Sequence, residues 1–297
     1  MNSNEKKAKK RKHTGTGVLV ITNINNKPHL VLGRETFKSL VLQDNLTIGM
    51  YEEFGGGIQK RSLSLECNAC FELREETSNL FNFSEPKVLR KGVNQYFDIP
   101  FKNNRMYRIY VVYLEDIEKI IHYFKYNRDK ITHNHSKYYK YKCFLEMDDI
   151  QFISLDTIKN NLKDETNYLR LKPDDIKTIR NNNSKLENKS KVNYNGVLKI
   201  NSTTFLSKRL LEFLNTKFPR QWKEGYFQNI DENHTDPETM ASGLDYCYQI
   251  FEDGFIKSRF KKNKGCDDII ILTNPRKNIP GMDKLTFLNG TWSIDGY

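Results

Sequence analysis

The chain has 297 residues, of which 37% are hydrophobic, 29% are charged and 12% are aromatic, with a formal net charge of +11. This length and aromatic content support a sizeable core and exclude wholesale disorder. No stretch approaches the roughly 20 apolar residues that cross a bilayer, and residues 1–13 lack the apolar segment of a secretory signal. We therefore expect a cytoplasmic protein with no membrane partner, and its five scattered cysteines fit reduced thiols.

The positive charge is concentrated near the N-terminus, within residues 1–13. The basic residues that we single out there as candidate RNA-binding groups are Lys6, Lys7, Lys9, Lys10, Arg11 and Lys12. A cationic tail attracts polyanions whatever their sequence, through the release of counterions. The tail can be interpreted as an RNA-binding arm or an import-type signal, or as a solvated tail that aids solubility.

The next elements form a predicted hairpin followed by a glycine run and a helix. Val18–Thr22 and His29–Gly33 are short apolar runs on either side of a turn cluster, as expected for two paired strands. Gly55–Gly57 follows, and helical spacing of apolar residues runs from Ser64 to about Leu80. Further strands are predicted at residues 93–100 and 105–114.

The remainder of the chain alternates charged segments with predicted elements. A charged segment at about 115–145 reads as an insertion with a helix at its start. A strand at 151–155 leads into a helix over 156–162, for which Asp156 is the predicted N-cap. Residues 181–192 are a polar linker candidate. Residues 193–297 form a C-terminal accessory region, with helical periodicity at 205–218 and a further element at 246–260.

Three glutamates on the predicted helix are the main candidates for a metal site. Glu72, Glu75 and Glu76 lie at spacings that place them on one helix face within a single turn. Like charges this close repel one another, and a divalent cation would compensate them; oxygen ligands of this kind suit Mg²⁺ or Mn²⁺. Glycines just upstream allow the backbone to approach a metal or a phosphate. The alternative is an ordinary solvated acidic face.

The ordered context of strand, glycines, helix and strand resembles the Nudix hydrolase family, whose box reads Gly-x5-Glu-x7-Arg-Glu-U-x-Glu-Glu-x-Gly-U, with U apolar. The match lies at Gly55-Gly56-Gly57-Ile58 and at Glu72-Leu73-Arg74-Glu75-Glu76-Thr77. The resemblance implies an α/β fold, a Nudix-like α/β/α sandwich with a mixed sheet over residues 14–180. The accessory region would add an α+β segment.

The chain departs from the box at three places. Leu63 stands at the first Glu of the box, Phe71 replaces the Arg, and Ser78-Asn79 replaces the glycine near its end. In the family that Arg orients a carboxylate of the cluster, so its loss affects Glu72, and Arg74 or a distant Arg is expected to substitute.

The resemblance also implies the roles of the site residues. Glu72, Glu75, Glu76 and the carbonyl of Gly56 would bind Mg²⁺ or Mn²⁺. Glu75 and Glu146 are the candidate catalytic residues: either Glu146 or a carboxylate of the helix would take the proton from the attacking water. Asp149 is the second choice for the position of Glu146, and an ordinary loop acid remains the alternative for both.

Nudix enzymes hydrolyse a nucleoside diphosphate linked to another group, so the resemblance implies a metal-dependent pyrophosphohydrolase. The long, Lys- and Asn-rich chain with a diverged box looks like the mRNA-decapping enzymes of large cytoplasmic DNA viruses. Its substrate would be capped mRNA, cleaved to m7GDP and 5′-monophosphate RNA in the host cytoplasm. Two alternatives remain: a pyrophosphohydrolase of diphosphoinositol polyphosphates or nucleotides, and a catalytically impaired Nudix-fold RNA-binding protein.

Overall fold

The computed structural model describes most of residues 12–169 and 196–261 and three short strands near the C-terminus. The described residues are 12–41, 47–58, 63–81, 83, 86, 89, 94–101, 105–119, 121–133, 144–169, 196–219, 240–261, 271–273, 284–288 and 291–295. Most of the predicted tail (residues 1–11) and the predicted linker (181–192) lie outside them.

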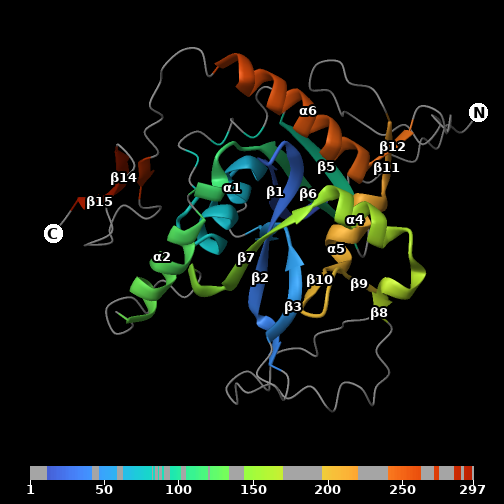
Figure 1. The fold of residues 1–297 in the computed structure, drawn as a ribbon, viewed down its shortest axis with the longest axis horizontal. Coiled ribbons are helices and arrows are strands. Elements are labelled where there is room, and N and C mark those ends of the chain that lie inside the picture. Colours follow the sequence, from blue (N-terminus) through green and yellow to red (C-terminus); the bar gives the residue numbers. More distant parts are fainter. Residues whose placement is uncertain are drawn as a thin grey trace, which may run out of the picture.

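A ten-stranded mixed sheet forms the centre of the molecule (Figure 1). Its strands are β1 (Lys12–Ile24), β2 (Lys27–Val41), β3 (Thr47–Glu52), β4 (Phe54–Gly57), β5 (Gln95–Phe101), β6 (Arg105–Tyr113), β7 (Met147–Ser154), β8 (Tyr168–Leu169), β9 (Val197–Lys199) and β10 (Thr204–Leu206). The order is β5-β6-β1-β2-β3-β10-β9-β8, with β4 also paired to β1 and β7 to β2. The pairs β1–β6 and β3–β10 are parallel, and the other pairs are antiparallel.

Helices and two smaller sheets surround this sheet. The helices are α1 (Leu65–Glu76), α2 (His122–His133), α4 (Leu155–Leu162), α5 (Lys208–Asn215) and α6 (Gly243–Lys261), with 3₁₀ turns at Ile117–Lys119 and Glu165–Asn167. The smaller sheets pair β11 (Lys217–Pro219) with β12 (Met240–Ser242), and β13 (Ile271–Thr273) with β14 (Lys284–Leu288) and β15 (Thr291–Asp295). No helix among the described residues is long and apolar enough to cross a membrane.

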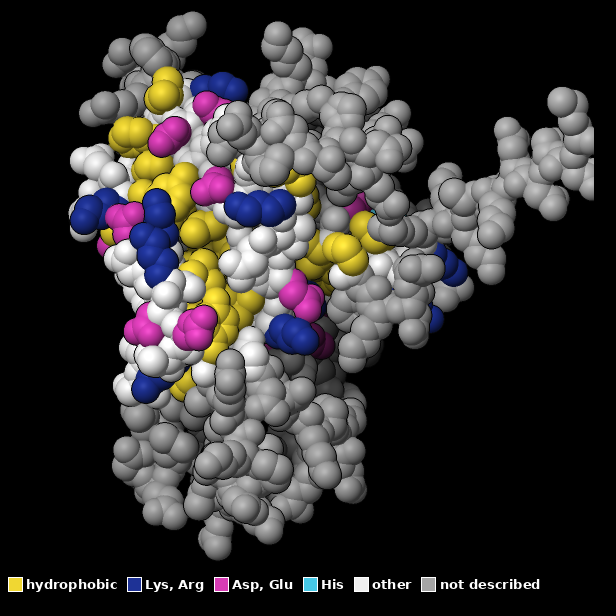
Figure 2. Space-filling model, turned by 90° about the vertical axis from the view of Figure 1, so that its right-hand side faces the viewer, with side chains coloured by type: hydrophobic (Ala, Val, Ile, Leu, Met, Phe, Trp, Pro, Cys, Tyr) yellow, Lys and Arg dark blue, Asp and Glu magenta, His cyan; other side chains and the backbone are white. Residues whose placement is uncertain are grey.

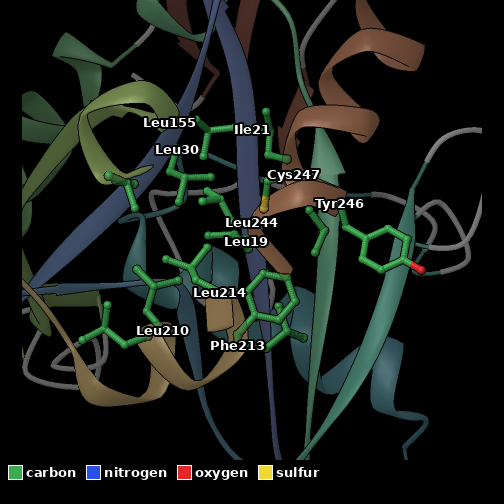
Figure 3. Packing of buried hydrophobic residues seen from close by; sticks show 14 of the residues in the cluster. Leu19, Ile21, Leu30, Leu155, Leu210, Phe213, Leu214, Leu244, Tyr246 and Cys247 are labelled. Atoms are coloured by element: carbon green, nitrogen blue, oxygen red, sulfur yellow. The ribbon is translucent and has the colours of Figure 1, made fainter. Parts of the chain in front are cut away.

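Both faces of the central sheet are buried, because apolar side chains of β1 alternate between them. Leu19 and Ile21 belong to the core on one face, where α5 and α6 pack (Figure 3). Val18 and Val20 belong to the core on the other face, with Ala69 of α1. The predicted mixed α/β arrangement with helices on both faces is therefore confirmed.

The predicted hairpin is confirmed, with Val20 opposite Val31 in β1 and β2. Its turn uses Asn25 and Asn26 at positive φ of 52° and 61°, which asparagine tolerates better than most residues. The predicted cap of the helix after β7 was wrong. α4 begins at Leu155 with Ser154 as N-cap, whose side chain accepts a hydrogen bond from the backbone N–H of Asp156.

The predicted accessory region, residues 193–297, contributes directly to this architecture. β9 and β10 extend the central sheet beyond β3, and β10 runs parallel to it with Phe205 opposite Met50. α5 is shorter than predicted, because Phe205 and Leu206 belong to β10 and Phe218 belongs to β11. Helices α5 and α6 supply most of the cover over one face of the sheet (Figure 3).

Candidate active site

Helix α1 presents its three glutamates to the interior beneath the glycine strand β4. The helix begins after Ser64, whose hydroxyl accepts a hydrogen bond from the backbone N–H of Cys67, and it packs against β1 and β4. Glu72, Glu75 and Glu76 are all buried. The face that sequence reasoning selected is therefore an interior face, and the alternative of a solvated acidic surface is wrong.

Gly56 brings the backbone of β4 against this helix. A Cβ added to Gly56 would lie 2.7 Å from Oε2 of Glu72, closer than unlinked atoms approach without one of them shifting. The carboxylate of Glu72 thus occupies the space that a side chain at residue 56 would need. The structure brings Gly56 and Glu72 together, as predicted for a site that uses both.

Three further buried glutamates lie near the trio. Glu35 comes from β2, Glu52 from the end of β3, and Glu53 immediately precedes β4. Sequence reasoning missed them as site residues, because a lone carboxylate on a strand has no distinctive pattern. The available signal was the Glu52-Glu53 pair immediately before Phe54 and the glycines, where a strand rich in apolar residues ends on two charges.

A single arginine from the C-terminal part of the chain enters this acidic cluster. Arg209 of α5 forms ion pairs with Glu53 at 2.5 Å and with Glu52 at 3.3 Å, and its guanidinium donates a hydrogen bond to the carbonyl of Gly55 at 3.3 Å. The guanidinium also lies 4.7 Å from the ring centroid of Tyr107. Arg209 lies 154 residues from Gly55 in the chain, so no local sequence signal could have identified it.

Arg74 and a distant arginine were the two candidates to substitute for the box arginine that Phe71 replaces. The guanidinium of Arg74 lies 5.3 Å from the ring centroid of Phe71, the residue at the box arginine position. Arg209 is the arginine whose ion pairs reach the acidic residues beside β4.

Glu76 is a buried carboxylate among other acidic side chains. Burial raises the pKa of Glu76 well above its usual range, and the nearby charges of Glu35, Glu72 and Glu52 raise it further, while Arg209 opposes them. One carboxylate oxygen of Glu76, Oε2, is buried and has no hydrogen-bond partner. A buried carboxylate is costly unless it is paired or coordinates a metal.

These observations fit a divalent cation by donor chemistry. No three His, Cys, Asp or Glu side chains among the described residues form a ready-made metal cage. The carboxylates of Glu72 and Glu76 nevertheless lie within mutual electrostatic influence, with Gly56 beside Glu72. Hard oxygen donors and an excess of negative charge are what Mg²⁺ and Mn²⁺ require.

Glu146 lies beside this cluster on a loop that the fold holds firmly. The backbone N–H of Thr36 in β2 donates to the carbonyl of Glu146 at 2.7 Å, and the Thr36 hydroxyl donates to the carbonyl of Leu145 at 3.0 Å. Burial raises the pKa of Glu146, and the charge of Glu75 raises it further. The charge of Glu75, the other predicted catalytic residue, therefore acts on Glu146, which is exposed at the surface.

The end of α1 is tied to the same loop. Ser78 and Asn79, which replace the glycine of the box, both adopt positive φ, 51° and 66°, the conformation that glycine adopts most easily. The Ser78 hydroxyl donates to the carbonyl of Phe144 at 2.6 Å, and the Asn127 amide of α2 donates to the carbonyl of Ser78 at 3.0 Å. Ser78 therefore adopts a backbone conformation that favours glycine, and its hydroxyl makes a hydrogen bond that glycine could not make, to the residue two positions before Glu146.

Asp149, the second choice, has other partners. Its carboxylate accepts hydrogen bonds from the Tyr51 hydroxyl at 2.5 Å and from the Gln151 amide at 3.2 Å. Its neighbour Asp148 accepts one from Arg34 at 2.6 Å. Asp149 is therefore bound to Tyr51 and Gln151, whereas the charge of Glu75 acts on Glu146.

The predicted RNA-binding residues lie almost entirely outside the described part of the chain. Lys6, Lys7, Lys9, Lys10 and Arg11 are not described, and Lys12 is the exposed first residue of β1. On the face shown in Figure 2, the coloured Lys and Arg side chains are interspersed with Asp and Glu around a band of apolar side chains. The positive surplus is not gathered among the described residues of that face.

The chain is similar to known proteins only at the level of solved structures, and at low identity. No family model matches the chain, and no curated protein matches it. Among solved structures, the chain is similar to an Ap4A hydrolase from C. elegans, with 8% identity and a TM-score of 0.28 over 48% of this chain and 80% of that chain. It is also similar to the NUDIX domain of Shewanella oneidensis NrtR complexed with ADP ribose, with 12% identity and a TM-score of 0.29 over 53% and 82%.

A further similar structure is a mutT/nudix family protein from Listeria innocua, with 15% identity and a TM-score of 0.25 over 50% of this chain and 80% of that chain. TM-scores and identities this low do not establish a shared fold or activity. The functional conclusion therefore comes from the side chains of the site.

Proposed function

We propose that this chain is a divalent-cation-dependent pyrophosphohydrolase of the Nudix type, acting on capped mRNA. The observation that carries the proposal is the buried trio Glu72, Glu75 and Glu76 under the glycine strand, with one oxygen of Glu76 lacking a hydrogen-bond partner. A fold does not retain this much buried negative charge without a compensating group. Arg209 is paired with Glu52 and Glu53, and we propose that the buried trio on α1 binds a cation.

The residues that would hold Mg²⁺ or Mn²⁺ are Glu72, Glu75, Glu76 and the backbone carbonyl of Gly56. When bound, the cation neutralises the charge of a pyrophosphate and lowers the pKa of a water molecule that attacks it. The rest of the task is positioning and charge stabilisation, as in phosphoryl transfer generally. The buried face of α1 and the close approach of Gly56 to Glu72 provide that positioning.

Glu146 is the proposed general base. Burial and the charge of Glu75 raise its pKa, which strengthens it as a proton acceptor. Its hydrogen-bonded loop fixes its distance from α1. Hydrolysis of the bond between the α- and β-phosphates of the cap, counted from the RNA, would give m7GDP and an RNA with a 5′-monophosphate.

Support for an RNA substrate comes from charge. The net charge is +11, and the basic residues Lys6 to Lys12 directly precede or begin β1, the strand that pairs with β4. A long RNA would be bound through many phosphate contacts, each of which releases counterions. A small nucleotide would gain little from such a tail.

The test is incubation of RNA carrying a labelled cap with the protein and Mn²⁺, followed by separation of the products. Release of m7GDP is the expected result. Hydrolysis only of diphosphoinositol polyphosphates or free nucleotides would change the substrate and retain the enzyme class. RNA binding without hydrolysis of any of these would mean that the chain is a binding protein.

A matched pair of variants ties the activity to the site. Glu76→Gln keeps the shape of the side chain and removes its charge, and we expect it to lower the rate at least about 100-fold. Glu252→Gln makes the same change on an exposed position of α6 and should retain the parent's rate. Equal activity of the two variants would contradict the proposed site.

A further inference from the structure

Arg209 extends from α5 into the acidic cluster beside β4. It begins in α5, one residue after the helix starts at Lys208, and its guanidinium ends between Glu52, Glu53 and the carbonyl of Gly55. Its burial favours loss of charge, but Glu52 and Glu53 raise its pKa well above the usual value and keep it protonated. It is a permanent positive charge inside an acidic cluster.

The guanidinium contacts both ends of the short segment that leads into the proposed site. Glu52 closes β3, Glu53 follows it, and Gly55 begins the glycine run. The next residue, Gly56, lies against the carboxylate of Glu72. A single side chain therefore links α5 to the segment that determines where β4 meets α1.

The planar shape of the group matters here. An arginine presents several N–H donors in a fixed plane and can serve two carboxylates and a carbonyl at once, whereas a lysine is a compact point charge. Tyr107 of β6 lies against the guanidinium and limits its movement. This geometry restrains the direction in which the Gly55 carbonyl points.

Its charge also divides the acidic cluster into two parts. Glu52 and Glu53 are neutralised by Arg209, while Glu76 receives only a smaller, opposing influence from it and remains beside Glu35 and Glu72. Arg209 therefore acts mainly on the carboxylates beside β4 and less on the trio of α1.

We infer that Arg209 is a positioning residue for the proposed metal site, supplied by the region after the predicted linker. It fixes the Glu52–Gly55 segment and, through Gly56, the carboxylate of Glu72. This inference depends on the proposed function for its meaning in catalysis. Its effect on cation binding is measurable without any substrate.

The test compares the full-length parent with Arg209→Lys and Arg209→Met. Lys208→Met is the matched control, because Lys208 is the preceding residue of α5 and its side chain is exposed. For each protein, Mn²⁺ is titrated and the bound fraction is followed by the electron paramagnetic resonance signal of free Mn²⁺. The free energy of unfolding is measured in parallel without metal.

We expect Arg209→Lys to fold and to bind Mn²⁺ about tenfold more weakly than the parent, the range seen when groups that orient metal ligands are lost. Lys208→Met should bind Mn²⁺ as the parent does. If the cap is hydrolysed, Arg209→Lys should lower kcat with little change in KM, since the guanidinium is engaged by Glu52, Glu53 and the carbonyl of Gly55. Arg209→Met serves as the charge-free comparison. If Arg209→Met does not fold, the Mn²⁺ affinity of Arg209→Lys alone decides the role of Arg209.

Two results would overturn the inference. One is parent-like Mn²⁺ binding by folded Arg209→Lys, and the other is a parent that binds no Mn²⁺ at all. A parent that binds Mn²⁺ but hydrolyses neither capped RNA nor other pyrophosphates contradicts the proposed function alone. In that case the Mn²⁺ titrations of the variants still decide the role of Arg209.

Discussion

Gly56 lies so close to the carboxylate of Glu72 that no side chain fits at residue 56: a Cβ there would lie 2.7 Å from Oε2 of Glu72 and 3.0 Å from its carboxylate carbon. The glycine is therefore needed for contact across β4 and α1, not for an unusual backbone angle. This relationship connects the two halves of the proposed site, which are separated in sequence by the first turns of the helix.

Gly56→Ala should displace the Glu72 carboxylate and weaken Mn²⁺ binding about 10- to 100-fold, as changes that reorient metal ligands typically do. The control is Gly57→Ala, because a Cβ there would meet only the carbonyl of Thr14 at 3.9 Å. Isothermal titration with Mn²⁺ measures both. Equal affinities for the two variants would show that Glu72 does not need its present position.

Ser78→Ala should destabilise the fold by about 1–2 kcal/mol, because it removes the hydrogen bond to the Phe144 carbonyl and leaves a buried carbonyl without that donor. Ser78→Gly loses the same bond but relieves the positive φ of 51°, so its loss should be smaller. Urea unfolding of the two variants measures the difference. A larger loss for glycine than for alanine would mean that the backbone angle costs nothing here.

Stability without metal should fall as the pH rises. The folded-state pKa of Glu76 is raised above the ordinary value of 4.5, so the folded chain binds that proton more tightly than the unfolded chain does. The stabilisation is present at low pH and is lost as the pH rises from about 4.5 through the raised pKa. Glu146 acts in the same direction.

Mn²⁺ should reverse this loss, since it replaces the proton as the compensating charge. We expect the increase in Tm on adding Mn²⁺ to be larger at about pH 8 than at about pH 5. Thermal unfolding in EDTA and in Mn²⁺ at both values tests this. The Tm of Glu76→Gln should depend less on pH and less on Mn²⁺ than the Tm of the parent. An equal increase in Tm on adding Mn²⁺ at the two pH values would contradict the account.

Asp98 should act in the opposite sense and away from the site. Burial alone would raise its pKa, but hydrogen bonds from Arg108 and His13 lower the pKa to about 2. Stability from this group is therefore present at neutral pH and is lost as the pH falls from about 4 toward 2. Asp98→Asn should cost about 2 kcal/mol near pH 7 and little near pH 2, measured by urea unfolding. An equal cost at both would rule out a charge effect.

The local patterns of the sequence predicted the local elements. Short apolar and β-rich runs predicted the β1–β2 hairpin, β5 and β6, and the helical spacing around Glu72 predicted α1. The cap of α4 was misplaced at Asp156 because the predicted strand ran to Leu155, whereas β7 ends at Ser154; strand ends depend on pairing with β2, which a local pattern does not contain.

The long-range relationships could not be read from the sequence. Pairing of β10 with β3 joins residues about 150 positions apart along the chain, and it carries α5 and Arg209 to the acidic cluster. Glu35, Glu52 and Glu53 look like surface carboxylates until the fold buries them. The missing box arginine suggested that Arg74 or a distant arginine substitutes for it, and only the tertiary structure shows that Arg209 reaches the acidic residues beside β4.

The most direct test of the central claim is the anomalous difference map of crystals of the protein soaked in Mn²⁺. The account predicts a peak at coordination distance, about 2–2.5 Å, from carboxylate oxygens of Glu72, Glu75 and Glu76. A map in which those three side chains face no peak, at a Mn²⁺ concentration that saturates hydrolysis, would contradict it.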